Sequence, residues 1–227
     1  MDSRSSRGMN DTISAARSRS LSDRIAEGRR IFKLAGPLIV NNLAIAGMQF
    51  ADAVMAGSIG ARELAAVAIG GSVWFLGFTV CLGLMMAISP IAARHYGAGT
   101  PELIGRYTRQ ALWLALALGA AFIAIIHAAI EPALTYVGIA EEFRDITISY
   151  TKTIVLGAPA ICLFLAFRFT TEGIGETRPI MYTSLIALVT NVFLNWMFMF
   201  GNLGAPELGA QGAAVASATT MLVIALI

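Results

Sequence analysis

Six long apolar segments account for most of this chain, and they restrict its fold more than any other feature of the sequence. A helix needs roughly 20 consecutive apolar residues to cross the hydrocarbon core of a bilayer, and each segment is about that long. The segments cover residues 31–57, 64–93, 107–130, 146–171, 179–200 and 209–227. The sequence therefore predicts an all-α membrane protein with six transmembrane helices.

The composition agrees with a membrane protein because charge is scarce. Charged residues make up 13% of the chain, whereas a soluble domain carries roughly 25%. The formal net charge of +2 is too small to suggest binding to nucleic acid. Cys81 and Cys162 both lie within apolar segments, which indicates buried thiols rather than a disulfide framework or a metal site.

Residues 1–30 differ from the rest of the chain, since they are rich in arginine and serine and poor in apolar residues. We predict a basic, largely disordered tail over this range. Alternatively, residues 21–34 form a short amphipathic helix at the membrane surface. Basic residues favour the cytoplasmic side of a membrane. They concentrate in this tail and in the connections after the second and fourth segments, at Arg94, Arg106, Arg109, Arg168 and Arg178. We therefore expect a cytoplasmic amino terminus.

Asp52 is the only acidic residue inside any of the strongly apolar segments. A carboxylate facing lipid at such a position costs roughly 2.5–3.5 kcal/mol, so it is a candidate functional residue by default. We expect it to have polar partners inside the protein. The alternative is that Asp52 lies at the outer interface and only caps the end of its helix.

The expected partners of Asp52 come from the fifth and sixth segments. Asn191 and Asn195 are four residues apart, which places them on one face of a helix. The sixth segment contributes Ser217. A carboxylate, two carboxamides and a hydroxyl can form an oxygen-rich pocket for Na+, or hold a proton on the carboxylate. In the other interpretation, the asparagines only join helices through hydrogen bonds.

Several stretches, in order and at consistent spacing, resemble the multidrug and toxic compound extrusion (MATE) family in its NorM-like bacterial branch. They are LAGP at 34–37, FADAVMAG at 50–57, GLMMAISP at 83–90, HYGAG at 95–99, NVFLNW at 191–196 and APELG at 205–209. The resemblance covers nearly everything from residue 31 onward. It implies a transporter of the bacterial inner membrane rather than an enzyme, exporting cationic amphipathic compounds in exchange for Na+ or H+.

The resemblance also implies roles for single residues. The family's cation site matches Asp52, Asn191, Asn195 and, with a looser match, Ser217, so that the first three would be the ligands of a bound Na+. Pro37 matches a proline that the family is proposed to use in bending its first helix. Some relatives have an aspartate at the position of Asn195, which leaves the choice between sodium and proton coupling open. No cofactor is implied other than the coupling ion.

The length of the chain is the main departure from the family pattern. MATE proteins have about twelve helices in two lobes, and residues 31–227 match only the amino-terminal lobe. We therefore expect the chain to require a second lobe, or a second copy of itself, in addition to the lipid bilayer. The alternative function is a truncated, non-transporting membrane lobe that acts only as a scaffold or assembly partner.

Overall fold

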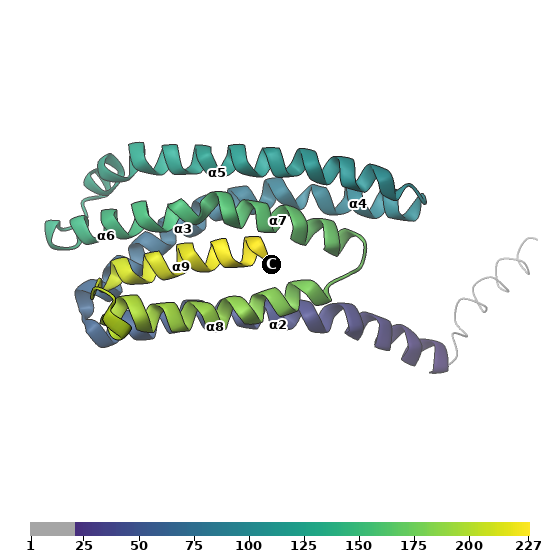
Figure 1. Ribbon diagram of the computed structural model, residues 1–227, viewed down its shortest axis with the longest axis horizontal. Helices are drawn as coiled ribbons and strands as arrows, with labels where there is room; N and C mark the ends of the chain where they lie inside the picture. The colour runs from purple at the N-terminus through teal and green to yellow at the C-terminus, as the bar shows by residue number, and fades with distance from the viewer. Residues whose placement is uncertain (1–20) are drawn as a thin grey trace, which may run out of the picture.

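The computed structural model describes residues 21–227, with side chains from residue 35 onward. The described part is helical throughout, apart from short connections (Figure 1). Helix α2 runs without a break from Leu21 to Ile59, so residues 21–30, which we assigned to the disordered tail, are helical. The rest of the expected tail lies outside the described residues.

The predicted all-α fold of six helical segments is confirmed. After α2 come α3 (Ala61–Met86) with α4 (Ile88–Gly97), α5 (Pro101–Val137), α6 (Glu141–Ile154) with α7 (Ala158–Gly173), α8 (Arg178–Phe200) and α9 (Ala210–Leu226). Five of these segments are long and apolar enough to cross a membrane. The sixth, α9, is apolar but shorter, with 17 residues.

Two of the segments are interrupted next to a proline. Proline has no N–H to donate to the carbonyl four residues earlier. The carbonyl four residues before Pro90, and the one four residues before Pro159, therefore have no helical N–H donor. The helix breaks lie beside these carbonyls, at Ala87 between α3 and α4 and at the 3-10 turn Val155–Gly157 between α6 and α7. Pro37 behaves differently, since α2 continues through it.

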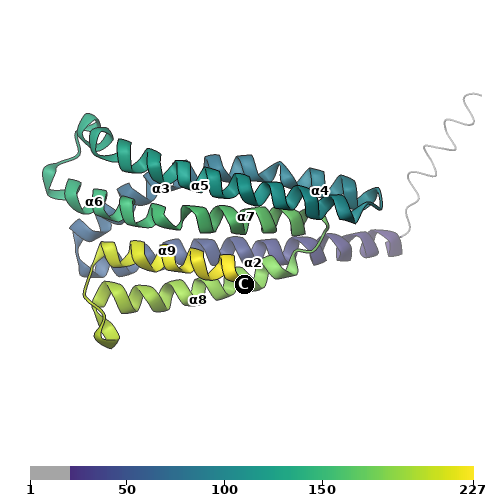
Figure 2. The same cartoon turned by 45° about the horizontal axis from the view of Figure 1, so that its top comes forward.

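The helices run back and forth along one long axis (Figures 1 and 2). The connections α2–α3, α5–α6 and α8–α9 gather at one end, which we call the outer end, and α4–α5 and α7–α8 lie at the opposite, inner end. Helix α2 packs along α8, α5 packs along α7, and α9 contacts α6, α7 and α8. This arrangement brings the outer ends of α2 and α8 together, where the sequence predicts a site.

Glycines allow the closest helix approaches. A Cβ atom on Gly119 of α5 would lie 2.4 Å from the Cα of Pro159 in α7, and one on Gly212 of α9 would lie 2.4 Å from the carbonyl oxygen of Phe198 in α8. The largest core cluster lies between α3, α5 and α7. It includes Cys81 and Cys162, which are free, buried thiols as expected.

Candidate functional site

Asp52 contacts α8 through a side-chain hydrogen bond. It lies near the outer end of α2, and the side-chain Nδ2 of Asn195 donates a hydrogen bond to Asp52 Oδ1 at 2.5 Å. The two residues are 143 positions apart in the sequence and meet because α2 packs along α8. Helix α2 continues to Ile59. The interpretation that Asp52 only caps its helix is therefore wrong.

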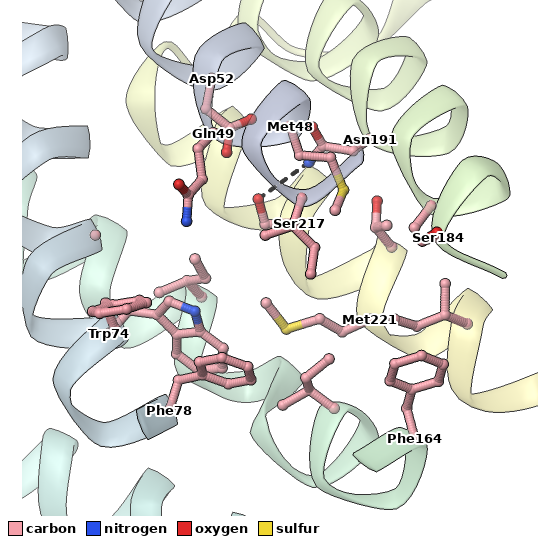
Figure 3. Close-up of a pocket in the computed structure, with 18 of the residues that line it drawn as sticks. Met48, Gln49, Asp52, Trp74, Phe78, Phe164, Ser184, Asn191, Ser217 and Met221 are labelled. Atoms are coloured by element: carbon pink, nitrogen blue, oxygen red, sulfur yellow. Dashed lines mark hydrogen bonds between the residues drawn. The ribbon is translucent and has the colours of Figure 1, made fainter. Parts of the chain in front are cut away.

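A chain of hydrogen bonds extends from Asp52 to α9. Asn195 Nδ2 also donates to Asn191 Oδ1 at 3.2 Å. Asn191 Nδ2 in turn donates to Ser217 Oγ at 3.3 Å (Figure 3). Asn191, Asn195 and Ser217 are all buried. The structure thus brings the four expected site residues into one network, while their binding of a cation stays a prediction.

The network is rich in oxygen but carries a single formal charge. The Oδ1 atom of Asn195 is buried and has no hydrogen-bond partner in the described part of the chain. No group of three or more His, Cys, Asp or Glu side chains suited to a metal occurs among the described residues. One carboxylate with neutral amide and hydroxyl oxygens fits a hard monovalent cation or a proton better than a transition metal.

Asp52 and Asn191 also line an open cavity of about 530 Å³ whose walls come from α2, α3, α6, α7, α8 and α9. Its walls are largely aromatic and aliphatic, with Trp74, Phe78, Phe164 and methionines such as Met221 pointing inward (Figure 3). Drug-sized molecules bind in cavities of roughly 300–1,000 Å³ with mostly apolar walls. The cavity is thus large enough for an amphipathic molecule, with Asp52 at its wall.

The cavity has polar groups toward both ends. Asp52, Asn191 and Ser217 lie toward the outer end, whereas Asn41, Arg168 and Ser184 lie toward the inner end. On α8, Ser184 lies eleven positions before Asn195, which is roughly 16 Å along the axis at 1.5 Å per residue.

Some of these cavity residues were not predicted from the sequence. We assigned Arg168 to the connection after the fourth segment, but the structure places it inside α7, at the cavity wall. The missed signal was its position within the expected fourth segment, residues 146–171. Asn41 was also missed, although a carboxamide in an apolar segment is costly to bury without hydrogen-bond partners. Its residue is 2% exposed. Tyr150 of α6 is buried and lines the cavity too.

Pro37 lies inside α2, four residues before Asn41 and far along the helix from Asp52. Because its ring lacks an N–H, the helix is locally weaker there. Whether α2 bends at this position stays a prediction.

Comparison with known proteins connects this geometry to a family. The MatE family model matches residues 37–197. The chain is 35% identical over 201 residues to the multidrug resistance protein NorM of Vibrio cholerae, covering 88% of this chain and 44% of NorM. It is 37% identical over 196 residues to the multidrug resistance protein PmpM of Pseudomonas aeruginosa, covering 86% and 41%.

Solved structures show the same fold. A MATE family transporter in an outward-facing conformation superposes with a TM-score of 0.79 at 24% identity, covering 87% of this chain and 43% of that one. A MATE structure in a bent conformation gives a TM-score of 0.78, with 88% and 44% covered. The chain spans less than half the length of these relatives.

Proposed function

Since this chain belongs to the MATE family, we propose that it works as the amino-terminal half of a secondary multidrug exporter. Cationic amphipathic compounds would leave the cell in exchange for Na+ or H+. The observation that carries this proposal is the contact between Asp52 and Asn195 beside a large apolar cavity.

The exchange follows from the single charge of the site. Asp52 is the one carboxylate among the cavity-lining residues, and it can neutralise one cation at a time. A sodium ion or proton on Asp52 therefore competes with a cationic substrate that reaches the same carboxylate. Such competition couples entry of the ion to release of the substrate.

A bound ion would also change the hydrogen bond that connects α2 to α8. In this structure, Asp52 Oδ1 accepts from Asn195 of α8, so a cation that engages the carboxylate rearranges that bond. A ligand shifts a conformational equilibrium by its differential affinity for the two states. We propose that occupancy of Asp52 shifts α2 between a straight and a bent shape, with Pro37 as its weak point.

We further propose that the amino terminus is cytoplasmic in a bacterial inner membrane, because the basic residues concentrate on that side. Asp52 then lies toward the outer face. A second six-helix half, or a second copy of this chain, would complete the walls of the transport path.

The test is ethidium accumulation in cells that lack their own exporters. We would express this chain alone and joined to whatever coding sequence follows it. We expect active efflux in at least one of these forms and its loss in Asp52→Asn. Glu102→Gln is the matched control because Glu102 is an exposed carboxylate in the first turn of α5.

Efflux that survives Asp52→Asn would refute the role of Asp52. A chain that inserts and self-associates without exporting dye in either form would favour the scaffold alternative.

A further inference from the structure

Arg168 is a cationic group at the wall of a cavity otherwise expected to receive cations. It lies in α7, five residues before the helix ends at Gly173, and it is among the residues that line the cavity. Its Nε atom is buried and has no hydrogen-bond partner in the described part of the chain. Buried polar groups in native proteins are nearly always hydrogen-bonded, so this N–H is available to a ligand. The guanidinium also lies over the Phe169 ring, 5.6 Å from its centroid, a contact that leaves the N–H unpaired.

Neither Glu172 nor Ser184 forms an ion pair or hydrogen bond with the Arg168 side chain in the described part of the chain. Glu172 follows one turn later on α7 and acts on Arg168 electrostatically, but the described residues contain no ion pair between them, and Glu172 Oε2 is itself buried without a partner. The hydroxyl of Ser184 donates to the Met181 carbonyl. An anion at this end of the cavity would therefore be recognised by Arg168.

Arg168 and Asp52 lie toward opposite ends of the same cavity. Arg168 and Ser184 are both a few residues from the inner connection 174–177, at depths of roughly 8 and 9 Å along their helices. Asp52 and its partner Asn195 lie instead near the outer ends of α2 and α8. The cavity thus has a negative group toward one end, a positive group toward the other and aromatic walls between them.

We propose that Arg168 binds a carboxylate of the substrate, so that this cavity prefers zwitterionic amphipathic compounds to purely cationic ones. Guanidinium groups recognise carboxylates through paired N–H donors. A substrate with its cationic part toward Asp52 and its carboxylate toward Arg168 satisfies both ends, whereas a pure cation leaves Arg168 unpaired. This inference rests on the proposed function of the cavity as the substrate site.

The test uses two dyes that differ at one group. Tetramethylrhodamine carries a free carboxylate and is zwitterionic near neutral pH, whereas its methyl ester is a cation of nearly the same size. Binding to the purified 227-residue chain would be followed by dye anisotropy in a neutral maltoside detergent, which excludes anionic lipid head groups. We expect the zwitterion to bind about tenfold more tightly or better, the range of a charged hydrogen bond.

Variants then assign the preference to Arg168. Arg168→Gln should abolish the advantage of the zwitterion while leaving the ester unchanged or better bound, and Arg168→Lys should keep part of it. Arg109→Gln removes the same charge from an exposed position on α5 and should leave the preference intact. The comparison of the two dyes on the unmodified chain does not depend on any variant folding.

Equal binding of the two dyes to the unmodified chain would overturn the role of Arg168 alone. So would equal losses for both dyes in Arg168→Gln. If neither dye binds, the cavity is not the substrate site, and both this inference and the proposed function of the cavity are rejected.

Discussion

Gly212 offers a sharp test of how closely α9 must approach α8. It lies in the first turns of α9, beside the outer end of α8, where Leu208 N donates to the Phe198 carbonyl at 3.0 Å and Gly209 N donates to the Met199 carbonyl at 3.3 Å. A Cβ atom at Gly212 would lie 2.4 Å from that Phe198 oxygen and 2.8 Å from Met199 N. These obstacles are backbone atoms, so no side chain can turn away to make room.

The Gly212→Ala substitution should therefore displace α9. Real Cβ atoms essentially never come closer than 3.0 Å to such neighbours, so the 2.4 Å contact requires a movement of at least about 0.6 Å. The hydrogen bond from Asn191 to Ser217, already 3.3 Å long, does not survive much lengthening. Overpacking of this kind typically costs about 1–3 kcal/mol, or roughly 2–4 °C of Tm per kcal/mol for a chain of this size.

The assay is thermal unfolding in detergent, reported by a maleimide dye that becomes fluorescent on reaction with the two buried, free cysteines. Gly83→Ala is the matched control, since Gly83 is an exposed helical glycine with nothing within 4 Å of an added Cβ. Alanine favours a helix by up to about 1 kcal/mol over glycine, so the control should be neutral or stabilising. If Gly212→Ala unfolds at the same temperature as Gly83→Ala, the argument from close packing fails.

Three further outcomes are expected with the same assay. Glu63→Ala should lower Tm by several degrees, since Glu63 Oε2 accepts from the backbone N–H of Ala210 at 2.5 Å and caps α9, a contact worth about 1–2 kcal/mol; an unchanged Tm would contradict this. If sodium is the coupling ion, NaCl should raise Tm relative to choline chloride. At a sodium concentration 100 times Kd, binding adds about 2.7 kcal/mol to the free energy of unfolding. Asp52→Asn should abolish that difference, and a difference that persists would place the ion elsewhere. Lys152→Met should leave Tm unchanged because the ion pair of Lys152 with Glu131 is exposed; a clear loss would show that the pair is structural.

The sequence predicted the helices and the residues of the Asp52 hydrogen-bond network largely from local rules, while the binding of a cation there stays a prediction. A long apolar run needs no knowledge of the fold to be assigned as a membrane helix. The cost of a lone carboxylate in such a run marks Asp52 as a residue with a partner. The spacing of Asn191 and Asn195 gives them a shared helix face. Their meeting with Asp52 depends on which helices pack together. The polar residues of the fifth and sixth segments suggested that meeting, and the family resemblance implied the same residues.

Arg168 and Glu63 were missed for different reasons. The sequence places Arg168 within the expected fourth segment, residues 146–171, but we assigned it to the following connection together with Arg178. The structure shows that Arg168 lines the cavity. Glu63 lies in the first turn of α3 and has the sequence pattern of an ordinary acidic residue at a helix start. Its contact with Ala210 spans 147 positions, and no periodicity in the sequence encodes it.

Helix α9 shows why such contacts matter for the site. It is the shortest of the six segments, yet it supplies Ser217 to the network. Glu63 caps its start, and Gly212 lets it lie against the backbone of α8. The middle of α9 approaches the turn before α7 at Gly157, where a Cβ added to Gly157 would lie 3.0 Å from the Cα of Ala218. Ser217 lies between the last two contacts. Its distance from Asn191 is therefore set by backbone packing on both sides rather than by the 3.3 Å hydrogen bond itself. Substitutions at either glycine should therefore disturb the proposed ion site without changing any residue of the network.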